Sequence, residues 1–429
     1  MKKYDEYKDS GVAWIGEVPK HWEVIKTSLA FQGIGSGTTP STSKKEYYDD
    51  NGNGKYWLQT GDLEDGIVYD TSKKVSNIAI KECNLTFYPI DSIIIAMYGA
   101  TIGKVGILGI ESATNQACCV IPVTKKQIAK YFFYEFLACK PALLIAAIGG
   151  GQPNISQDTI KKLKIVIPPI NEQTAIATYL DTHCAKIDNL ISIQQKRIAL
   201  LQELKQSVIT HAVTKGLNPN VEMKQSGVEW IGDVPKHWEV LRGKYALSIL
   251  SGFPFDSQKF EFEDNGVYMP LIRIRDINGS STEVYYSGSY PIESVVKTGE
   301  VLIGMDGDFN ISKWKGTNAL LNQRVCKLRE DSSMNTHYAF YMLSSPLKAI
   351  NSVTYATTVK HLSVYDIYNA FIPVPPISEQ TAIASYLDHK CATIDTSISN
   401  AQHQIDLLQE YKQSLITEVV TGKRKVTDN

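Results

Sequence analysis

The sequence predicts an α+β protein in which two globular regions of mixed helix and strand alternate with two long helices. Two repeated stretches predict this plan. A stretch of 47 residues occurs twice, 207 residues apart, with about two thirds of its positions identical. A block of 17 residues also occurs twice, 216 residues apart, and differs at only three positions. The chain of 429 residues therefore consists of two similar halves, and we expect an internal pseudo-two-fold repeat.

The longer repeat, at 168–214 and 375–421, has the pattern of one long helix in each half, and we expect the helical segments at 168–216 and 375–422. Pro-Pro begins each copy, and no Gly or Pro follows until Gly216 and Gly422, which suit C-terminal caps. About 43 helical residues at 1.5 Å each would give a rod of roughly 65 Å.

A stripe of mostly apolar residues follows each long helix in steps of three and four, and a glutamine interrupts it in the first helix only. Such spacing is typical of a coiled coil. The stripe is expected at Ile187, Leu190, Gln194, Ile198, Leu201, Leu204 and Val208, and at Ile394, Ile398, Ala401, Ile405, Leu408, Tyr411 and Leu415. A helix with one apolar stripe needs a partner. We expect the two copies to form an antiparallel coiled coil; the alternative is that each helix packs on its own globular region.

The shorter repeat, at 8–24 and 224–240, precedes each globular region. It contains two tryptophans in the sequence Trp-Ile-Gly-x-Val-Pro-Lys-His-Trp. We expect Trp14, Ile15, Val18 and Trp22 to be buried; the alternative is an exposed tryptophan pair that anchors a partner. The predicted division of the chain is 1–24 (repeated block), 25–167 (first globular region), 168–216 (long helix), 217–240 (repeated linker block), 241–374 (second globular region), 375–422 (long helix) and 423–429 (polar tail).

Composition excludes several classes of protein. The net charge is −1, and hydrophobic content of 43% with 21% charged residues is typical of soluble globular proteins. No apolar run reaches membrane-spanning length, and the polar start does not resemble a signal peptide. The seven cysteines show no paired spacing, which favours a reducing cytoplasm. Gly-Ala-Thr-Ile-Gly-Lys-Val lacks the spacing and the Ser/Thr of a phosphate loop, and no His-Glu-x-x-His motif or other metal site is expected.

The Pro-Pro-x-x-Glu-Gln start of each long helix, the Ser-Gly-Val-x-Trp-Ile-Gly block and the two-halved plan together resemble the specificity subunits of type I restriction-modification systems. In that family each globular part is a target recognition domain that reads one half of a bipartite site in double-stranded DNA. The antiparallel helices separate the two domains and set the spacer between the half-sites. The resemblance implies a non-catalytic subunit that docks methyltransferase subunits, two of them expected, and restriction (translocase) subunits. S-adenosylmethionine, ATP and Mg²⁺ are then expected in those partners, with no cofactor in this chain.

Side chains that read bases or hold phosphates are mostly Arg, Lys, Asn, Gln, Ser and Thr. The Gly-rich loop 35–45 carries several of them and is similar to a turn that the family has at this place; the alternative is a solvated loop without a ligand. The candidate DNA contacts in 25–167 are Ser36, Thr38, Thr39, Lys44, Lys45, Gln59, Thr60, Tyr98, Thr101, Lys104, Gln152 and Asn154.

In the second globular region two arginines are the best candidates for reading the major groove. Arg273 and Arg275 are expected to alternate onto one face of a strand, where Arg can contact guanine O6 and N7 bidentately. The alternative is an ion pair with Asp276 or Glu283. The candidate DNA contacts in 241–374 are Ser251, Phe253, Ser257, Lys259, Arg273, Arg275, Asn310, Lys313, Thr357, Thr358, Lys360 and His361.

The starts of the long helices are expected to carry the methyltransferase interface, through Glu172, Gln173, Glu379 and Gln380. The formal charge is +3 over 25–167 and 0 over 241–374, so a DNA reader would have to segregate its basic groups onto one face. Two rival functions stay open: an interaction scaffold with no DNA role, and a DNA-binding regulator that needs no partner.

Overall fold

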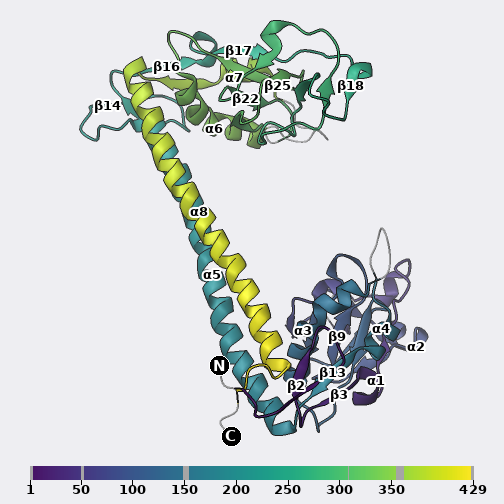
Figure 1. Ribbon diagram of the computed structural model, residues 1–429. Coiled ribbons are helices and arrows are strands. Elements are labelled where there is room, and N and C mark those ends of the chain that lie inside the picture. Colours follow the sequence, from purple (N-terminus) through teal and green to yellow (C-terminus); the bar gives the residue numbers. More distant parts are fainter. Residues whose placement is uncertain (1–2, 50–52, 148–153, 308, 354–361, 427–429) are drawn as a thin grey trace. The chain divides into compact units, whose positions relative to one another are not determined.

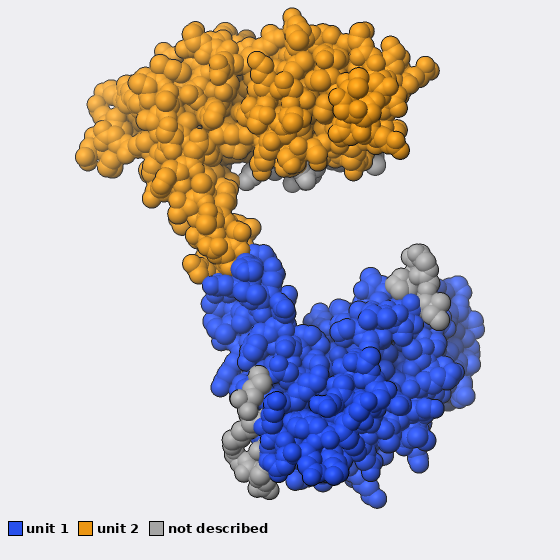
Figure 2. Space-filling view, in the orientation of Figure 1, with its two compact units in different colours: residues 1–195, 402–429 blue, residues 196–401 orange. Residues whose placement is uncertain are grey.

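The structure, a computed structural model, describes residues 3–49, 53–147, 154–307, 309–353 and 362–426. Two compact units make up the chain, one of residues 1–195 and 402–429 and the other of residues 196–401 (Figure 2). Each unit contains one globular domain, the first part of one long helix and the last part of the other. The long helices are α5 (Ile170–Lys215) and α8 (Ile377–Val420) (Figure 1).

Within each unit the two long helices run antiparallel, as predicted. In unit 1 the Lys412 ammonium near the end of α8 lies 2.6 Å from the Asp188 carboxylate near the start of α5. In unit 2 Lys205 lies 2.7 Å from Asp395. Since Asp395 and Lys412 follow their counterparts by 207 residues, the same ion pair occurs in both units. The caps are also confirmed: Gly216 and Gly422 have φ of 75° and 74°, a region that favours glycine.

The coiled-coil seam differs from the predicted stripe at three positions. Leu190, Leu204 and Tyr411 are 47%, 50% and 52% exposed. The seam position that follows Ile187 lies four residues along α5, at Ile191, whereas the prediction placed it three residues along, at Leu190. The partly buried seam positions of α5 that follow are Ile191, Gln194, Ile198, Leu201 and Lys205. Lys205 thus occupies a seam position, where its methylene stem packs while its ammonium reaches Asp395.

Two sheets and a covering helix form the globular domain of unit 1. The helix α3 (Ala129–Ile145) lies against strand β10. The five-stranded sheet has the order β4 (Gly35–Ser36), β12 (Cys118–Ile121), β9 (Ile93–Ala96), β10 (Val105–Leu108) and β6 (Gly66–Val68). The four-stranded sheet has the order β7 (Lys74–Val75), β5 (Lys55–Leu58), β11 (Ser112–Thr114) and β8 (Phe87–Tyr88). Short helices complete the domain: α1 (Thr27–Ala30), α2 (Asn77–Glu82) and α4 (Gln157–Lys162).

Strand β9 is apolar throughout because side chains pack against both of its faces. Side chains alternate between the two faces of a strand. Ile93 and Ile95 belong to the cluster that includes α3, whereas Ile94 and Ala96 belong to the cluster that includes Leu58 of the second sheet. Both faces of β9 are therefore covered, and every one of its side chains is buried.

Unit 2 repeats this plan. Its four-stranded sheet has the order β17 (Ser248–Ser251), β25 (Val325–Arg329), β22 (Val301–Gly304) and β23 (Ile311–Lys313). Its five-stranded sheet has the order β18 (Phe260–Glu261), β20 (Tyr285–Tyr286), β19 (Met269–Ile272), β24 (Ala319–Leu321) and β21 (Val295–Val296). The helices are α6 (Thr336–Val353) and α7 (Val364–Asn369). Strand β22, like β9, directs Val301 and Ile303 into one core cluster and Leu302 into another.

The repeated 17-residue block forms a small antiparallel strand pair in each half and then joins the globular domain. Trp22 and Trp238 are fully buried, and Trp22 lies in one cluster with Val419 and Val420 of α8. Burial of Ile15, Val18 and Trp22 confirms the prediction, whereas Trp14 is only partly buried. The strands are β1 (Tyr7–Asp9) with β2 (Glu17–Pro19), β14 (Met223–Gln225) with β15 (Asp233–Pro235), β3 (Glu23–Lys26) with β13 (Lys164–Ile167), and β16 (Glu239–Arg242) with β26 (Phe371–Val374).

One buried acid distinguishes the two domains. Glu135 of α3 is fully buried, and its carboxyl accepts the Val166 N–H at 2.8 Å. Burial raises the pKa of Glu135 to about 8, although the hydrogen bond from Val166 opposes the shift. Met342 stands at the equivalent place in unit 2, 207 residues later.

We predict that replacing Glu135 by Met makes unit 1 less sensitive to alkaline pH. Unfolded glutamate ionises near pH 4.5, so between that pH and about 8 only the folded chain holds the proton. The wild-type free energy of unfolding therefore falls as pH rises, by at most about 1.4 kcal/mol per pH unit. Urea unfolding from pH 5 to 8.5 checks this against Glu135→Met; a stability difference that stays constant over that range would contradict it.

Candidate nucleic-acid interface

Three loops converge in each domain where two parallel strands end. In the first domain β5 and β11 run parallel; the Asn115 N–H donates to the Leu58 carbonyl at 2.9 Å, and the Thr38 N–H donates to the Thr114 carbonyl at 3.0 Å. These bonds tie together residues 36–39, 59–62 and 114–117. The second domain ties 251–254, 273–276 and 321–324 in the same way, through parallel β19 and β24. We call each convergence a loop junction.

A glycine makes each loop junction possible. A Cβ on Gly37 would lie 1.7 Å from the Thr114 carbonyl oxygen, and one on Gly252 would lie 1.9 Å from that of Asn322. No side chain fits at such distances, so the first loop can approach the strand ends only at glycine. This close approach accounts for the Ser-Gly shared by two loops that otherwise differ.

An aspartate closes the middle turn of each loop junction. The Gln59 N–H donates to the Asp62 carboxylate at 2.8 Å, and the Arg273 N–H donates to the Asp276 carboxylate at 2.9 Å. Because this turn begins directly after Ile272, strand β19 ends there. The expectation that Arg273 and Arg275 share one strand face is therefore wrong: both lie in the turn.

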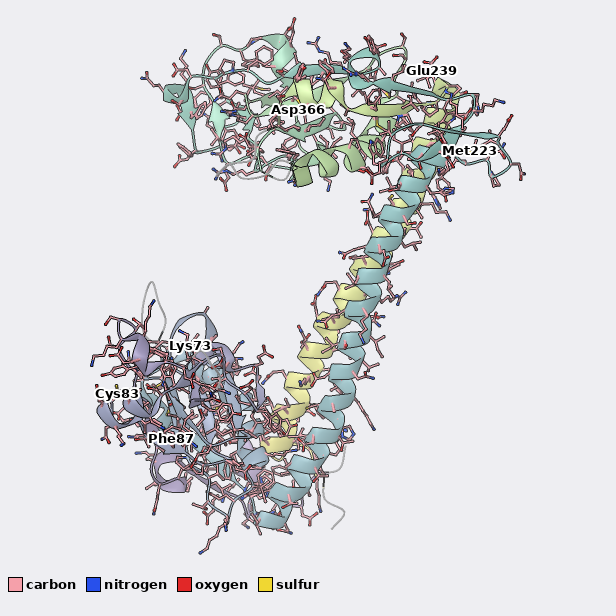
Figure 3. The ribbon with its side chains drawn as sticks, turned by 180° about the vertical axis from the view of Figure 1, so that it is seen from behind. Lys73, Cys83, Phe87, Met223, Glu239 and Asp366 are labelled. Carbon is pink, nitrogen blue, oxygen red and sulfur yellow. The ribbon has the colours of Figure 1, made fainter. Side chains whose placement is uncertain are left out.

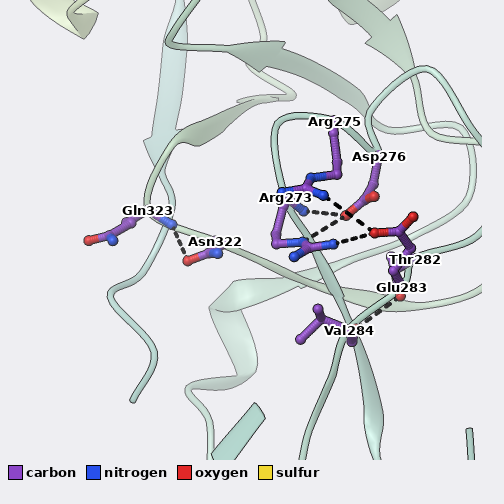
Figure 4. Close-up of polar contacts among 8 residues, drawn as sticks. All are labelled: Arg273, Arg275, Asp276, Thr282, Glu283, Val284, Asn322 and Gln323. Atoms are coloured by element: carbon purple, nitrogen blue, oxygen red, sulfur yellow. Dashed lines mark hydrogen bonds and ion pairs between the residues drawn. The ribbon is translucent and has the colours of Figure 1, made fainter. Parts of the chain in front are cut away.

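The two arginines differ in what they can still contact (Figure 4). The Arg273 guanidinium lies 2.9 Å from Glu283 and 3.6 Å from Asp276, and its side chain is 21% exposed. Arg275 lies 3.5 Å from Glu283, and its side chain is 65% exposed. Both arginines therefore form the ion pairs that were the alternative to DNA contact, but Arg275 keeps most of its N–H donors toward solvent.

Most of the other candidates in the first domain reach the surface. Lys44 is already engaged, since hydrogen bonds to Tyr47 and Glu82 raise its pKa to about 12. Tyr98 pairs with Asn154 across an isolated bridge and is 42% exposed. The exposed candidates besides these are Ser36, Thr38, Thr39 and Lys45, and the partly buried ones are Gln59, Thr60, Thr101 and Lys104. Gln152 lies outside the described residues.

In the second domain the candidate Lys313 is already bound to side chains within the fold. The Lys313 ammonium lies 2.8 Å from Asp388 of α8 and 5.1 Å from the Phe340 ring centroid, so it ties β23 to two helices. That pairing argues against the predicted DNA contact for Lys313. Ser251, Ser257, Lys259 and Asn310 are exposed and Phe253 is partly buried, whereas Thr357, Thr358, Lys360 and His361 lie outside the described residues.

Two exposed glutamines in the loop junctions were missed by the sequence reasoning. Gln116 and Gln323 follow Asn115 and Asn322 directly. The signal that could have found them is the identical Asn-Gln pair in two regions that have otherwise diverged.

The start of each long helix receives hydrogen bonds from the repeated block. The Glu172 carboxylate accepts from Tyr4 Oη (2.7 Å) and Trp22 Nε1 (3.1 Å) and lies 2.7 Å from His21 Nε2. Glu379 has two such contacts, with His237 at 2.7 Å and Trp238 at 3.0 Å. The side chain of Glu172 is 10% exposed and that of Glu379 is 41% exposed.

Gln173 and Gln380 lie beneath the globular domains and are 3% and 0% exposed. Gln173 donates to the Pro168 carbonyl and accepts the Ile128 N–H, and Gln380 contacts Pro375 and Asn335 in the same manner. This burial contradicts a direct docking role for the two glutamines, because their amides are already used within the fold.

We predict that Glu172→Ala destabilises the chain more than the matched Glu379→Ala. Removal of Glu172 leaves the buried Trp22 indole N–H without this acceptor, a loss of about 1–3 kcal/mol. The Glu379 carboxylate is more exposed and has fewer hydrogen-bond partners, so water replaces it more readily as their acceptor. Urea midpoints of the two variants check the order, and equal losses would contradict it.

In the part of the chain that the structure describes, no cluster of His, Cys, Asp and Glu could hold a metal ion. Likewise, no helix among the described residues is long and apolar enough to cross a membrane.

Comparison with known proteins identifies the scaffold. The family model of the type I restriction modification DNA specificity domain matches residues 19–203 and 235–405. The EcoBI specificity subunit of Escherichia coli is 34% identical over 203 residues, which are 47% of this chain and 42% of that protein. The MjaIX specificity subunit of Methanocaldococcus jannaschii is 28% identical over 445 residues, covering 99% of this chain and 97% of that protein.

Two solved structures share the fold. One, from a study of complex assembly and conformational transition of the type I R-M system, has a TM-score of 0.73 at 15% identity and covers 94% of this chain and 98% of its own. The HsdS subunit from Thermoanaerobacter tengcongensis has a TM-score of 0.52 at 15% identity, with coverage of 95% and 98%. The chain therefore belongs to the type I restriction modification DNA specificity family, as a non-catalytic specificity subunit with one DNA specificity domain in each half.

Proposed function

We propose that this chain reads a bipartite DNA site, one half-site with each globular domain, and docks the methyltransferase and restriction subunits of its complex. The division into target recognition domains at 25–167 and 241–374 is part of this proposal. Two methyltransferase subunits are expected, because the proposed docking surface occurs twice. S-adenosylmethionine, ATP and Mg²⁺ would be bound by those partners, in the cytoplasm; the seven free thiols of this chain suit a reducing compartment.

The observation that carries the proposal is the repeated loop junction. Both domains hold three loops by the same backbone bonds, but the polar side chains differ: one turn has the partly buried Gln59 and Thr60, and the other has the partly buried Arg273 and the exposed Arg275. A shared scaffold with different polar side chains is what two domains need to read different bases. The exposed and partly buried candidates of the loop junctions are the proposed DNA contacts, together with Gln116 and Gln323.

The proposed docking surface is the His–Glu pair at the start of each long helix. His21 and His237 have side chains that are 49% and 45% exposed, so each helix start presents polar groups to a partner. The buried Gln173 and Gln380 would act indirectly, by holding each domain on its helix.

The experiment is to co-express the chain with its methyltransferase subunit in a host without adenine methylation. Single-molecule sequencing then maps N6-methyladenine. We expect one split motif, methylated on both strands at a fixed spacing. A stable complex that methylates no split motif would refute DNA reading and favour the interaction scaffold; methylation-independent, specific binding by the chain alone would favour a lone regulator.

We predict that Arg275→Ala relaxes one position of one half-site and leaves the other half-site intact. The loss of a bidentate contact to guanine costs about 1–3 kcal/mol, or roughly 5-fold to 150-fold in discrimination. Arg275→Lys keeps the charge but not the planar fork, so it should keep affinity and still lose discrimination. Methylome sequencing of both variants checks this; unchanged motifs would exclude Arg275 as a base reader.

We also predict that the coiled coil sets the spacer. Seven residues added at matching points of α5 and α8 preserve the seam and lengthen each helix by about 10 Å, or roughly three base pairs of DNA. The methylated motif should gain spacer length and keep both half-sites. Altered half-sites with an unchanged spacer would contradict this assignment.

A further inference from the structure

One basic segment beside the first loop junction is replaced by residues without positive charge at the equivalent positions of the second domain. Residues 70–74 lie against the turn 59–62, because the Ser72 N–H donates to the Asp62 carboxylate at 3.1 Å. The other oxygen of the same carboxylate accepts the Gln59 N–H at 2.8 Å. A single aspartate therefore fixes the position of this segment relative to the turn.

The segment presents positive charge at the surface of unit 1. Lys73 is exposed (Figure 3), and Lys74 is partly buried. With Lys45 they line an open hollow of about 530 Å³. Asp49 and Asp70 also line it, so the hollow has one net positive charge, and the Asp70 carboxylate already accepts the Thr71 N–H at 2.9 Å.

The second domain provides an internal comparison. The Trp57 N–H donates to the Lys73 carbonyl at 3.3 Å, and the Leu271 N–H donates to the Val284 carbonyl at 2.8 Å, so Val284 is the counterpart of Lys73. In the same register, Tyr56 is the cross-strand partner of Lys74, and Pro270 is the cross-strand partner of Tyr285. Tyr285 is therefore the counterpart of Lys74.

Both lysines are therefore absent from the equivalent strand of the second domain, and Glu283 stands at the place of Ser72. The fold is built without basic residues at these positions in unit 2, so it does not require them in unit 1. In the second domain the positive charge lies on the turn itself, at Arg273 and Arg275, beside that acid.

We propose that Lys73 and Lys74, with Lys45, form a phosphate-binding surface for the DNA backbone of the first half-site. This inference rests on the proposed function. Lysine is a compact point charge that attracts phosphate without distinguishing bases, whereas the neutral side chains of the neighbouring turn can do so. Asp62 is then a positioning residue that keeps the phosphate contacts and the reading turn in fixed geometry.

The test uses the complex of the full chain with its methyltransferase subunit, and DNA that contains its methylated motif. Binding constants of wild type and K73Q/K74Q are measured over a series of salt concentrations. Each lost phosphate contact should reduce the slope of log K against log[salt] by about 0.9, so the double variant should lose nearly two units. Its affinity at low salt should fall about 10-fold or more, while methylome sequencing returns the wild-type motif.

Two variants serve as controls. K73R/K74R keeps both charges and should keep the wild-type slope. K125Q/K126Q removes two exposed lysines near Ile128, whose N–H contacts Gln173 at the start of α5, and should leave the slope nearly unchanged.

The outcomes separate this inference from the proposed function. A wild-type slope in K73Q/K74Q, or a loss equal to that of K125Q/K126Q, would overturn the phosphate surface while DNA reading stands. A changed base preference in the first half-site would mean that the segment reads bases, which also overturns it. A wild-type complex that binds no split motif would remove the proposed function and this inference together.

Discussion

The antiparallel pairing of α5 and α8 is the constraint on which the rest of the structure depends. Each globular domain packs against the start of one long helix and the end of the other, so neither domain is completed by its own half of the sequence alone. Trp22 illustrates this, since its indole donates to Glu172 of α5 and it lies in one core cluster with Val419 and Val420 of α8. The apolar seam provides the pairing energy. The repeated Lys–Asp pairs are partly exposed, and pairs of that kind contribute about 0.2–1 kcal/mol each, so their main effect is on register.

The two domains place different side chains on one backbone arrangement. Gly37 and Gly252 allow the same close approach of a loop, and Asp62 and Asp276 close the same turn. Between these fixed points the charges differ: the first domain has lysines in the adjoining segment 70–74, and the second has arginines on the turn with an acid beside them. A binding surface can diverge in this way because its exposed side chains contribute little to stability, whereas the glycine and aspartate positions are required by the backbone.

The fold could be predicted from the sequence because repeats reveal architecture without reference to any single residue. The antiparallel helices, the glycine caps and the burial of Trp22 all followed from repeated patterns. The seam itself was partly misplaced, because Lys205 looks polar in the sequence although its methylene stem packs at a seam position. Arg273 and Arg275 were misplaced on a strand because alternation is a local signal, and the capture of the Arg273 N–H by Asp276 ends the strand.

The candidate site was less accessible to sequence reasoning for a physical reason. Lys44 and Lys313 have the residue type of a DNA contact, but the structure gives both of them partners within the fold, and Gln173 and Gln380 are buried. Only the tertiary arrangement shows which polar groups are already used. Conversely, Gln116 and Gln323 could have been selected from their identity in two diverged regions.

The central claim is that the two halves are equivalent supports carrying exchangeable recognition domains. Its most direct test replaces residues 241–374 with a second copy of 25–167, co-expresses the hybrid with the methyltransferase subunit, and sequences N6-methyladenine. The account predicts a split motif whose two halves are both the wild-type first half-site, in inverted orientation and at the original spacing. A hybrid that still methylates the wild-type second half-site would contradict it, because that specificity would then reside outside the exchanged domain.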